Sequence, residues 1–172
     1  MIQLEPFSPA DFDRFIEWID SKELLVTIAG TVFTYPLTTD QLQKYLQDPK
    51  SHSFNIVDKT PNEIIGHAEI IETDAELCKL DKIIIGSLSN RGKGIGQQLI
   101  YELLNYSFVD LGAKIVELNV YDWNIAGIKC YEKAGFTINP GKRQFTQLDG
   151  INWVALNMII GKDKWAKLGK RM

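Results

Sequence analysis

The stretch from residue 91 to residue 96 reads Arg-Gly-Lys-Gly-Ile-Gly. Glycines at alternate positions permit backbone dihedrals that are closed to other residues, and they leave the amide N–H groups open to an anion. The loop precedes a helix, so the positive end of the helix dipole points at the same place. Its two cations add formal charge. The pattern therefore predicts a diphosphate-binding loop made of Arg91, Gly92, Lys93, Gly94, Ile95 and Gly96.

Glycine-rich loops serve several classes of protein, and their spacing separates them. A P-loop requires Ser or Thr directly after its lysine, and Gly94 follows Lys93 here. A dinucleotide fingerprint, G-x-G-x-x-G, would place Gln97 or Leu99 where the last glycine must stand. Both readings fail, and a tight turn without a ligand would not require three glycines and two cations.

The elements around this loop form a strand–helix–strand unit. A run over residues 77–85 ends in three isoleucines, which suits a strand covered on both faces. Residues 94–111 carry apolar side chains at helical spacing, and Gly112 stands where the helix should end. A strand over residues 114–121 follows. A strand joined to its neighbour through a helix requires a right-handed crossover and a parallel pair.

The rest of the chain predicts further strands and helices around this unit. Ser8 and Pro9 suit the start of a helix that continues to Ile19, whereas residues 21–35 are expected to be irregular. The other expected helices cover residues 39–46 and 124–134, and the other strands cover residues 2–5, 53–58, 64–72, 143–147 and 151–160, with a turn at 139–141. We expect a mixed α/β sheet flanked by helices, in one domain over residues 1–172.

Composition excludes several classes of function. A net charge of −3 gives no general attraction to nucleic acid or anionic membranes, and no apolar run is long enough to span a membrane. Two cysteines and two histidines provide neither a disulfide framework nor a metal site, so no metal is expected. The start lacks a secretion signal, which predicts a cytoplasmic protein. The basic tail after residue 161 is expected to be solvated.

The loop and the residues that follow it resemble the GNAT family of N-acetyltransferases. The family's signature, Q/R-x-x-G-x-G/A, is filled by Arg91, Gly94 and Gly96, and the later positions by Asn124, Gly127, Tyr131 and Gly135-Phe136. Gly127 stands where Ala is more usual. The resemblance covers roughly residues 64–139. The region of residues 30–46, with Phe33-Thr34-Tyr35-Pro36-Leu37-Thr38, loosely resembles members near the ribosomal-protein alanine acetyltransferases.

The resemblance implies a mostly antiparallel sheet with a splayed parallel pair, in which residues 83–86 part from residues 118–121. It implies acetyl-coenzyme A as co-substrate, with its pantetheine arm in the gap on the main chain of Ile84, Ile85 and Gly86. Asn124 would order a helix start and contact the same arm. Tyr131 would contact it too and protonate the departing thiolate, after direct attack by a primary amine with no covalent enzyme intermediate.

The base that takes the proton of the amine stays open. Some relatives carry Glu at the position of Asn119, and others at the position of Leu80, next to Asp81. Asp81 and Glu69 are the candidates, with Glu72 or a chain of water molecules as alternatives.

Two rival functions remain. One is a non-catalytic acyl-coenzyme A-binding module of the same fold. The other is a nucleotide-binding switch, although the sequence lacks the metal-binding Ser/Thr and carboxylates that such a switch requires. The acceptor is also open among protein N-termini or lysines, polyamines, aminoglycosides and small metabolites. A homodimer through the terminal strands is compatible with the pattern.

Overall fold

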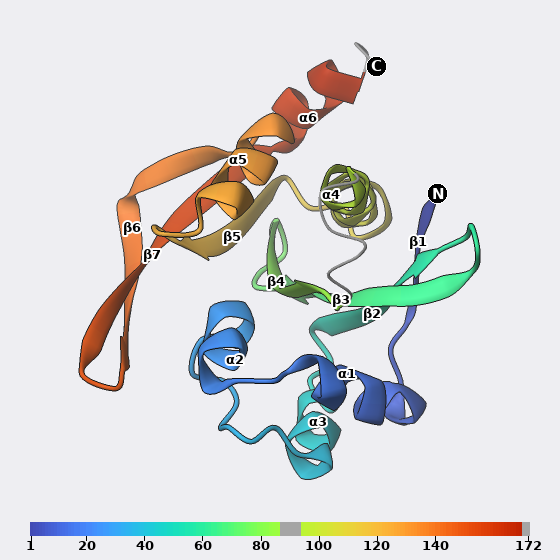
Figure 1. The fold of residues 1–172 in the computed structure, drawn as a ribbon. Helices are drawn as coiled ribbons and strands as arrows, with labels where there is room; N and C mark the ends of the chain where they lie inside the picture. Colours follow the sequence, from blue (N-terminus) through green and yellow to red (C-terminus); the bar gives the residue numbers. More distant parts are fainter. Residues whose placement is uncertain (87–93, 170–172) are drawn as a thin grey trace.

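The computed structural model describes residues 1–86 and 94–169, whose strands form one seven-stranded sheet in the order β1-β2-β3-β4-β5-β7-β6 (Figure 1). Every neighbouring pair is antiparallel except β4 and β5, which run parallel as the crossover pattern predicts. The strands are β1 (Ile2–Pro6), β2 (Ser51–Asp58), β3 (Glu63–Glu72), β4 (Leu77–Ile85), β5 (Ile115–Tyr121), β6 (Thr137–Leu148) and β7 (Ile151–Gly161). The predicted α/β fold class is confirmed.

The helices lie on both faces of this sheet. They are α1 (Phe12–Trp18), α2 (Lys22–Ala29), α3 (Thr39–Tyr45), α4 (Ile95–Asn105), α5 (Ile125–Lys133) and α6 (Lys162–Gly169), with a short 3₁₀ turn η1 (Pro9–Asp11) and a π-helical turn η3 (Tyr106–Asp110) that continues α4. Helix α4 covers one face, and α1 to α3 cover the other (Figure 1).

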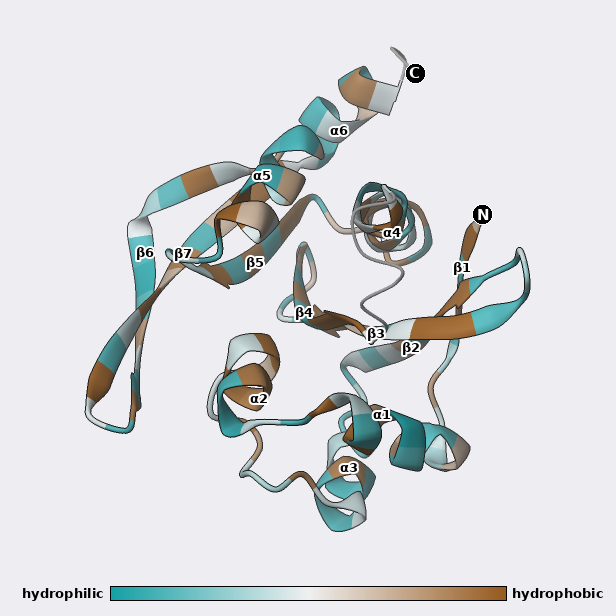
Figure 2. Cartoon of the chain, in the orientation of Figure 1, coloured by the Kyte–Doolittle hydropathy of each residue, from teal (hydrophilic) through white to brown (hydrophobic). Residues whose placement is uncertain are grey.

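Two apolar cores result, one on each face. Leu99 and Leu103 of α4 pack with Ile70 and Leu80 of the sheet on one side. Phe15, Leu25 and Leu42 of α1, α2 and α3 form the core of the other side together with neighbours that are also buried. The apolar colouring of β3 and β4 reflects this double burial (Figure 2), because strands covered on both faces need apolar residues at successive positions.

Helix α2 corrects the expectation that residues 21–35 are irregular. The Ser21 hydroxyl accepts a hydrogen bond from the Leu24 N–H at 3.2 Å and so caps the helix. Leu25 and Ala29 are buried against the sheet side of the molecule. The run Val26-Thr27-Ile28 is β-branched and has a low intrinsic helix propensity, and burial of one face outweighs that preference.

The C-terminal part differs from expectation in two ways. Strand β6 already begins at Thr137, and the predicted turn at 139–141 is an irregularity between Ile138 and Arg143 in its pairing with β7. The tail forms α6, whose Trp165 ring lies 5.2 Å from the Phe108 ring, measured between centroids. None of the described helices is long and apolar enough to cross a membrane.

Candidate active site

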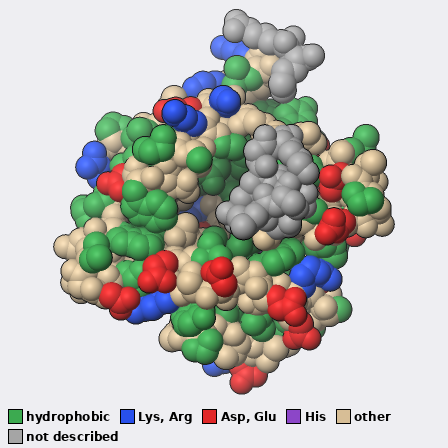
Figure 3. All heavy atoms as spheres, viewed as in Figure 1, with side chains coloured by type: hydrophobic (Ala, Val, Ile, Leu, Met, Phe, Trp, Pro, Cys, Tyr) green, Lys and Arg blue, Asp and Glu red, His purple; other side chains and the backbone are tan. Residues whose placement is uncertain are grey.

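Strands β4 and β5 pair over only four residues each. Leu77–Leu80 run beside Ile115–Leu118, and no pairing continues beyond Leu80 and Leu118 in the described residues. The strands part there and leave a cleft of about 70 Å³. It is lined by Leu80, Asp81, Lys82 and Ile83 of β4, by Leu118, Asn119, Val120 and Tyr121 of β5, and by Thr27, Ile28, Asn124 and Tyr131. Figure 3 shows the surface hollowed near the middle of the face seen in Figure 1.

A bulge in β4 lies beside this cleft. Asp81 pairs with Glu69 and Ile84 with His67, so β4 has one residue more than β3 between these pairs. Lys82 lies in the bulge with φ at 46°. This value falls in the left-handed region of backbone conformations, which residues other than glycine rarely adopt. The extra residue shifts the alternation of side chains, so Asp81, Lys82 and Ile84 are directed to the face of α1 to α3.

The bulge also decides which main-chain groups face the cleft. The Gly86 N–H donates to the Ile65 carbonyl at 2.9 Å and is not available to a ligand in the gap. Because N–H groups alternate sides along a strand, that of Ile84 also faces β3, and those of Ile83 and Ile85 are directed toward β5. The N–H of Ile85 is thus directed as expected, and those of Ile84 and Gly86 are not. Ile83, which the sequence did not indicate, joins the candidates, and the contacts with the co-substrate stay predictions.

The first turn of α4 supplies the described part of the predicted anion loop. Gly94 is the N-cap residue with φ at 78°, and as a glycine it supplies no capping side chain to this end of the helix. A Cβ on Gly96 would lie 3.2 Å from the Cys130 Sγ, so the small residue lets α4 and α5 approach closely. Uncapped N–H groups at a helix start suit a diphosphate. Arg91, Gly92 and Lys93 lie outside the described residues.

Asn124 and Tyr131 lie on the wall formed by α5. The Asn124 Oδ1 accepts a hydrogen bond from the Gly127 N–H at 3.0 Å and caps the helix. A Cβ on Gly127 would lie 2.8 Å from the Asn124 Nδ2, so a larger residue here would require the Asn124 amide to shift. Burial raises the pKa of Tyr131 well above the usual value, with smaller contributions from Cys130 and Asp81. Its hydroxyl is therefore protonated at neutral pH and can act as a proton donor.

Asp81 lies where the cleft meets a second pocket of about 440 Å³. One carboxylate oxygen accepts the Lys82 N–H at 2.9 Å, and the other accepts the Lys79 Nζ at 2.8 Å. The side chain is 19% exposed, so it is reachable from the pocket while its orientation is held. This position is compatible with the role of base.

Glu69 does not fit that role. Its side chain is 2% exposed, forms an ion pair with the Lys82 ammonium and accepts a hydrogen bond from the Ser51 hydroxyl. It lines neither the cleft nor the second pocket. Glu72, the other alternative, forms a hydrogen bond with His52 at 2.7 Å. The sequence did not separate Asp81 from Glu69 because it does not reveal the bulge.

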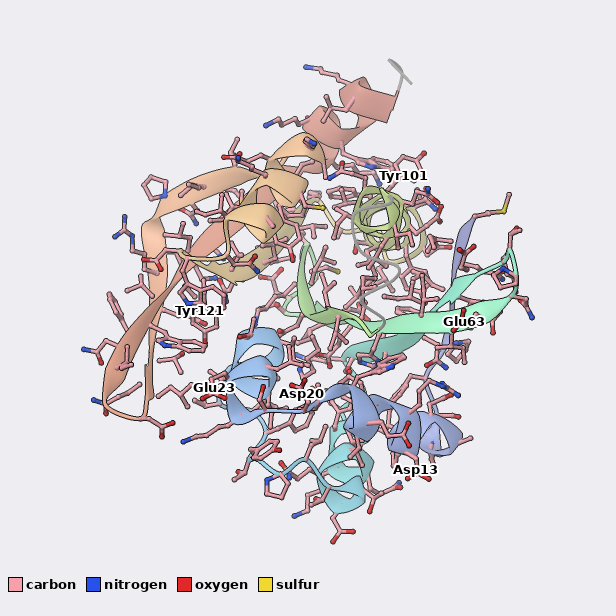
Figure 4. The ribbon with its side chains drawn as sticks, viewed as in Figure 1. Asp13, Asp20, Glu23, Glu63, Tyr101 and Tyr121 are labelled. Atoms are coloured by element: carbon pink, nitrogen blue, oxygen red, sulfur yellow. The ribbon has the colours of Figure 1, made fainter. Side chains whose placement is uncertain are left out.

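The second pocket lies between α2 with its following loop, β5 and β6. The Asn119 amide donates to the Gln144 side-chain oxygen at 3.1 Å, and the Tyr121 hydroxyl donates to the Thr146 hydroxyl at 3.1 Å. Figure 4 shows Tyr121 on β5, with Glu23 on α2 and Asp20 between α1 and α2. The lining was not predicted, although hydroxyl residues within an apolar segment, Thr27 and Thr31, were a usable signal.

Comparison with known proteins identifies the class. Residues 6–136 match the acetyltransferase (GNAT) family, and the chain belongs to this family. The earlier expectation of an acetyl-coenzyme A-dependent N-acetyltransferase is thereby confirmed. The finer resemblance to ribosomal-protein alanine acetyltransferases stays a prediction.

Individual relatives are distant. The chain is 26% identical over 147 residues to an N-acetyltransferase 9-like protein of Nematostella vectensis, covering 79% of this chain and 74% of the relative. It is 24% identical over 135 residues to the alpha/beta-tubulin-N-acetyltransferase 9 of Homo sapiens, covering 72% and 65%. Among solved structures, spermidine N-acetyltransferase from Vibrio cholerae, in complex with CoA and spermine, superposes with a TM-score of 0.80 at 23% identity, covering 96% of this chain and 98% of that one. At this identity the likeness concerns the fold.

Proposed function

We propose that this protein transfers the acetyl group of acetyl-coenzyme A to a primary amine by direct attack within a ternary complex. The observation that carries the proposal is the cleft between β4 and β5. It is bounded by a protonated tyrosine, Tyr131, and by a carboxylate, Asp81, and it opens toward a second pocket.

In this proposal the co-substrate extends from the start of α4 into the cleft. Its diphosphate binds the N–H groups of the loop formed by Arg91, Gly92, Lys93, Gly94, Ile95 and Gly96. The pantetheine arm lies along the main chain of Ile83 and Ile85, with Asn124 at its side. A main-chain N–H directed into the cleft stabilises the negative charge that develops on the thioester oxygen.

Tyr131 and Asp81 supply the proton transfers. The Asp81 carboxylate takes a proton from the ammonium form of the acceptor, which leaves a neutral amine. The amine nitrogen bonds to the acetyl carbon, the bond from that carbon to sulfur breaks, and the Tyr131 hydroxyl gives its proton to the sulfur. The nitrogen of the adduct then loses its second proton to the Tyr131 oxygen, and Asp81 releases the proton it took to water, so both groups return to their starting states. Tyr131 on α5 and Asp81 on β4 both line the cleft.

The second pocket is the proposed site of the acceptor, a small-molecule amine or an amine of a protein. Among the described residues that line it, the only charged side chains are those of Asp81 and Lys79, which pair with each other. The other polar groups are hydroxyls and amides. The acceptor amine would therefore displace Lys79 from Asp81.

We further propose that the protein acts in the cytoplasm as a single domain and forms a homodimer through the terminal strands.

Two measurements test the function. Calorimetric titration with acetyl-coenzyme A, coenzyme A and ATP should show binding of the first two and none of ATP. Thiol release should then follow addition of amines from a panel that includes an amino sugar, spermidine and a peptide with a free N-terminus. Binding without release from any amine would favour the non-catalytic module, and binding of ATP alone would favour the nucleotide switch.

A further inference from the structure

The ion pair between Glu69 and Lys82 is buried beside the active site and has no part in the proton transfers. Its side chains are 2% and 3% exposed. The Lys82 ammonium lies 5.8 Å from the ring centre of Phe33 and 5.1 Å from that of Tyr45, so aromatic faces surround it. The Asp81 carboxylate lies 3.9 Å away.

Stability alone does not explain such a pair. Two charges removed from water lose their hydration, and apolar side chains of similar volume often stabilise a protein as well or better. Lys82 also has the left-handed φ of the β4 bulge, which favours glycine. A lysine at position 82 therefore has two unfavourable features, a strained backbone conformation and a buried charge.

The position of the charge relative to the two cores suggests what the pair does. In a regular strand, successive side chains face opposite sides, so Asp81 on the α2 side would place Lys82 on the α4 side. There the ammonium would enter the apolar core around Leu99 and Leu103. The bulge avoids this by directing Lys82 to Glu69. A lysine therefore excludes the regular register, whereas an apolar side chain at the same place would permit it.

We propose that Glu69 and Lys82 are positioning residues for the transfer reaction. Their ion pair holds the β4 bulge, which keeps the Ile83 N–H directed into the cleft and the Asp81 carboxylate at the junction of the two pockets. The inference rests on the proposed function. In it the ion pair orients the groups that react and does not itself contact the substrates.

The test compares two double variants that both remove the buried charges. Glu69→Met with Lys82→Met conserves apolar volume but permits the regular register. Glu69→Met with Lys82→Gly supplies a residue that adopts the positive φ without strain and so favours the bulge. We expect the first variant to keep a thermal midpoint close to that of the unmodified protein and to lose about ten-fold in kcat. The KM for acetyl-coenzyme A should change by no more than about two-fold. The glycine variant should recover most of kcat despite its smaller side chain.

A matched control is the half-exposed pair of Glu5 on β1 and Lys59 directly after β2, whose Oε1 and Nζ atoms lie 2.8 Å apart. Its double variant, Glu5→Gln with Lys59→Met, should leave kcat unchanged. The inference is overturned if the Glu69→Met, Lys82→Met protein has the same kcat as the unmodified protein. It is also overturned if the Glu69→Met, Lys82→Gly protein is no more active than the Glu69→Met, Lys82→Met protein.

A second route remains if the methionine pair does not fold. Glu69→Gln keeps the size of the side chain, and it should lower kcat with KM unchanged, while an unaltered kcat would again contradict the proposal. Failure of the proposed function itself is distinguishable, because the unmodified protein would then release no thiol with any amine.

Discussion

Tyr131 combines an apolar setting with access to the cleft. Burial raises its pKa, with Cys130 and Asp81 as smaller causes, so the phenol holds its proton at neutral pH. A thiol is more acidic than this phenol, with a pKa of about 8.5 against about 10 for free tyrosine. In the proposed mechanism the phenol can therefore protonate the thiolate only while its oxygen takes up the proton that the amide nitrogen releases. Its chemistry thus depends on the same burial that packs it near Phe136, with ring centres 6.1 Å apart.

Replacing Tyr131 with Phe should lower kcat by about ten-fold or more, because the ring remains and only the proton donor is lost. Binding of coenzyme A, measured by calorimetry, should change little. Turnover equal to that of the unmodified protein, with the acceptor that gives the highest rate, would remove Tyr131 from the mechanism.

His67 is a buried histidine away from the cleft. Its Nε2 lies 3.2 Å from the Tyr45 hydroxyl, and its Nδ1 has no hydrogen-bond partner among the described residues. Burial, followed by the charge of Lys82, lowers the pKa of His67 to about 3. The native protein therefore keeps this ring neutral over a pH range in which the unfolded chain would protonate it.

This difference predicts a loss of stability in acid. Between the unfolded pKa of 6.5 and the folded value of about 3, the unfolded state binds the extra proton, so stability falls as pH falls. The free energy of unfolding should drop by up to about 1.4 kcal/mol per pH unit from this residue. Urea titrations at pH 7 and pH 5 should show a smaller drop for His67→Phe than for the unmodified protein. Equal drops would show that His67 is not responsible.

At the residue scale, the motif predicted Asn124 and Tyr131 because their spacing on α5 is local and helical. It did not distinguish Asp81 from Glu69, since that choice depends on a one-residue shift in β4 that leaves no periodic signal. The proposed base and the proposed main-chain contact of Ile83 depend on pairing between strands, which the sequence alone does not determine.

Among the elements, the end of β4 depends on two glycines. A Cβ on Gly66 would lie 2.3 Å from the Ile84 carbonyl oxygen, and one on Gly86 would lie 2.2 Å from the Trp18 ring. Both contacts are too short for any real side chain, so β3, β4 and α1 approach one another closely only because these residues are small.

Gly66→Ala should therefore destabilise the protein by roughly 1–3 kcal/mol, because a backbone carbonyl cannot move aside as a flexible side chain can. Gly161→Ala is the control, since a Cβ there would meet nothing within 4 Å and no positive φ is involved. Thermal unfolding of the two variants measures the difference, and equal midpoints would contradict the expected clash.

The strand–helix–strand unit was predictable because its apolar pattern is continuous and α4 has a clear stripe. Helix α2 was not predictable, because its β-branched run has a low helix propensity and the helix forms only through its packing in the folded protein. The same is true of β6, where Pro140 and Gly141 indicate a turn although pairing with β7 continues on either side.

At the scale of the whole molecule, β1 to β4 form one half of the sheet and β5 to β7 the other. The halves share a ladder of only four residues from each strand, Leu77–Leu80 and Ile115–Leu118. Beyond it, the described residues of β4 and β5 do not pair with each other. A pantetheine amide in the gap would bind groups from both halves.

Binding of coenzyme A should accordingly slow amide hydrogen exchange in residues 81–85 and 119–121 more than in β1 or β7. Exchange measured by mass spectrometry, with and without coenzyme A, tests this expectation. A uniform effect over all strands would show that the gap is not the place where the ligand adds order.

The short ladder also gives the molecule a natural hinge. The ladder and the core around Leu99, which packs against strands of both halves, hold one end of the gap closed, so a change of width is confined to the end beyond Leu80 and Leu118. A thioester bridging the halves would draw them together, and a free thiol that has lost its acetyl group would hold them less firmly, so that the chemical step itself would loosen the grip on the product.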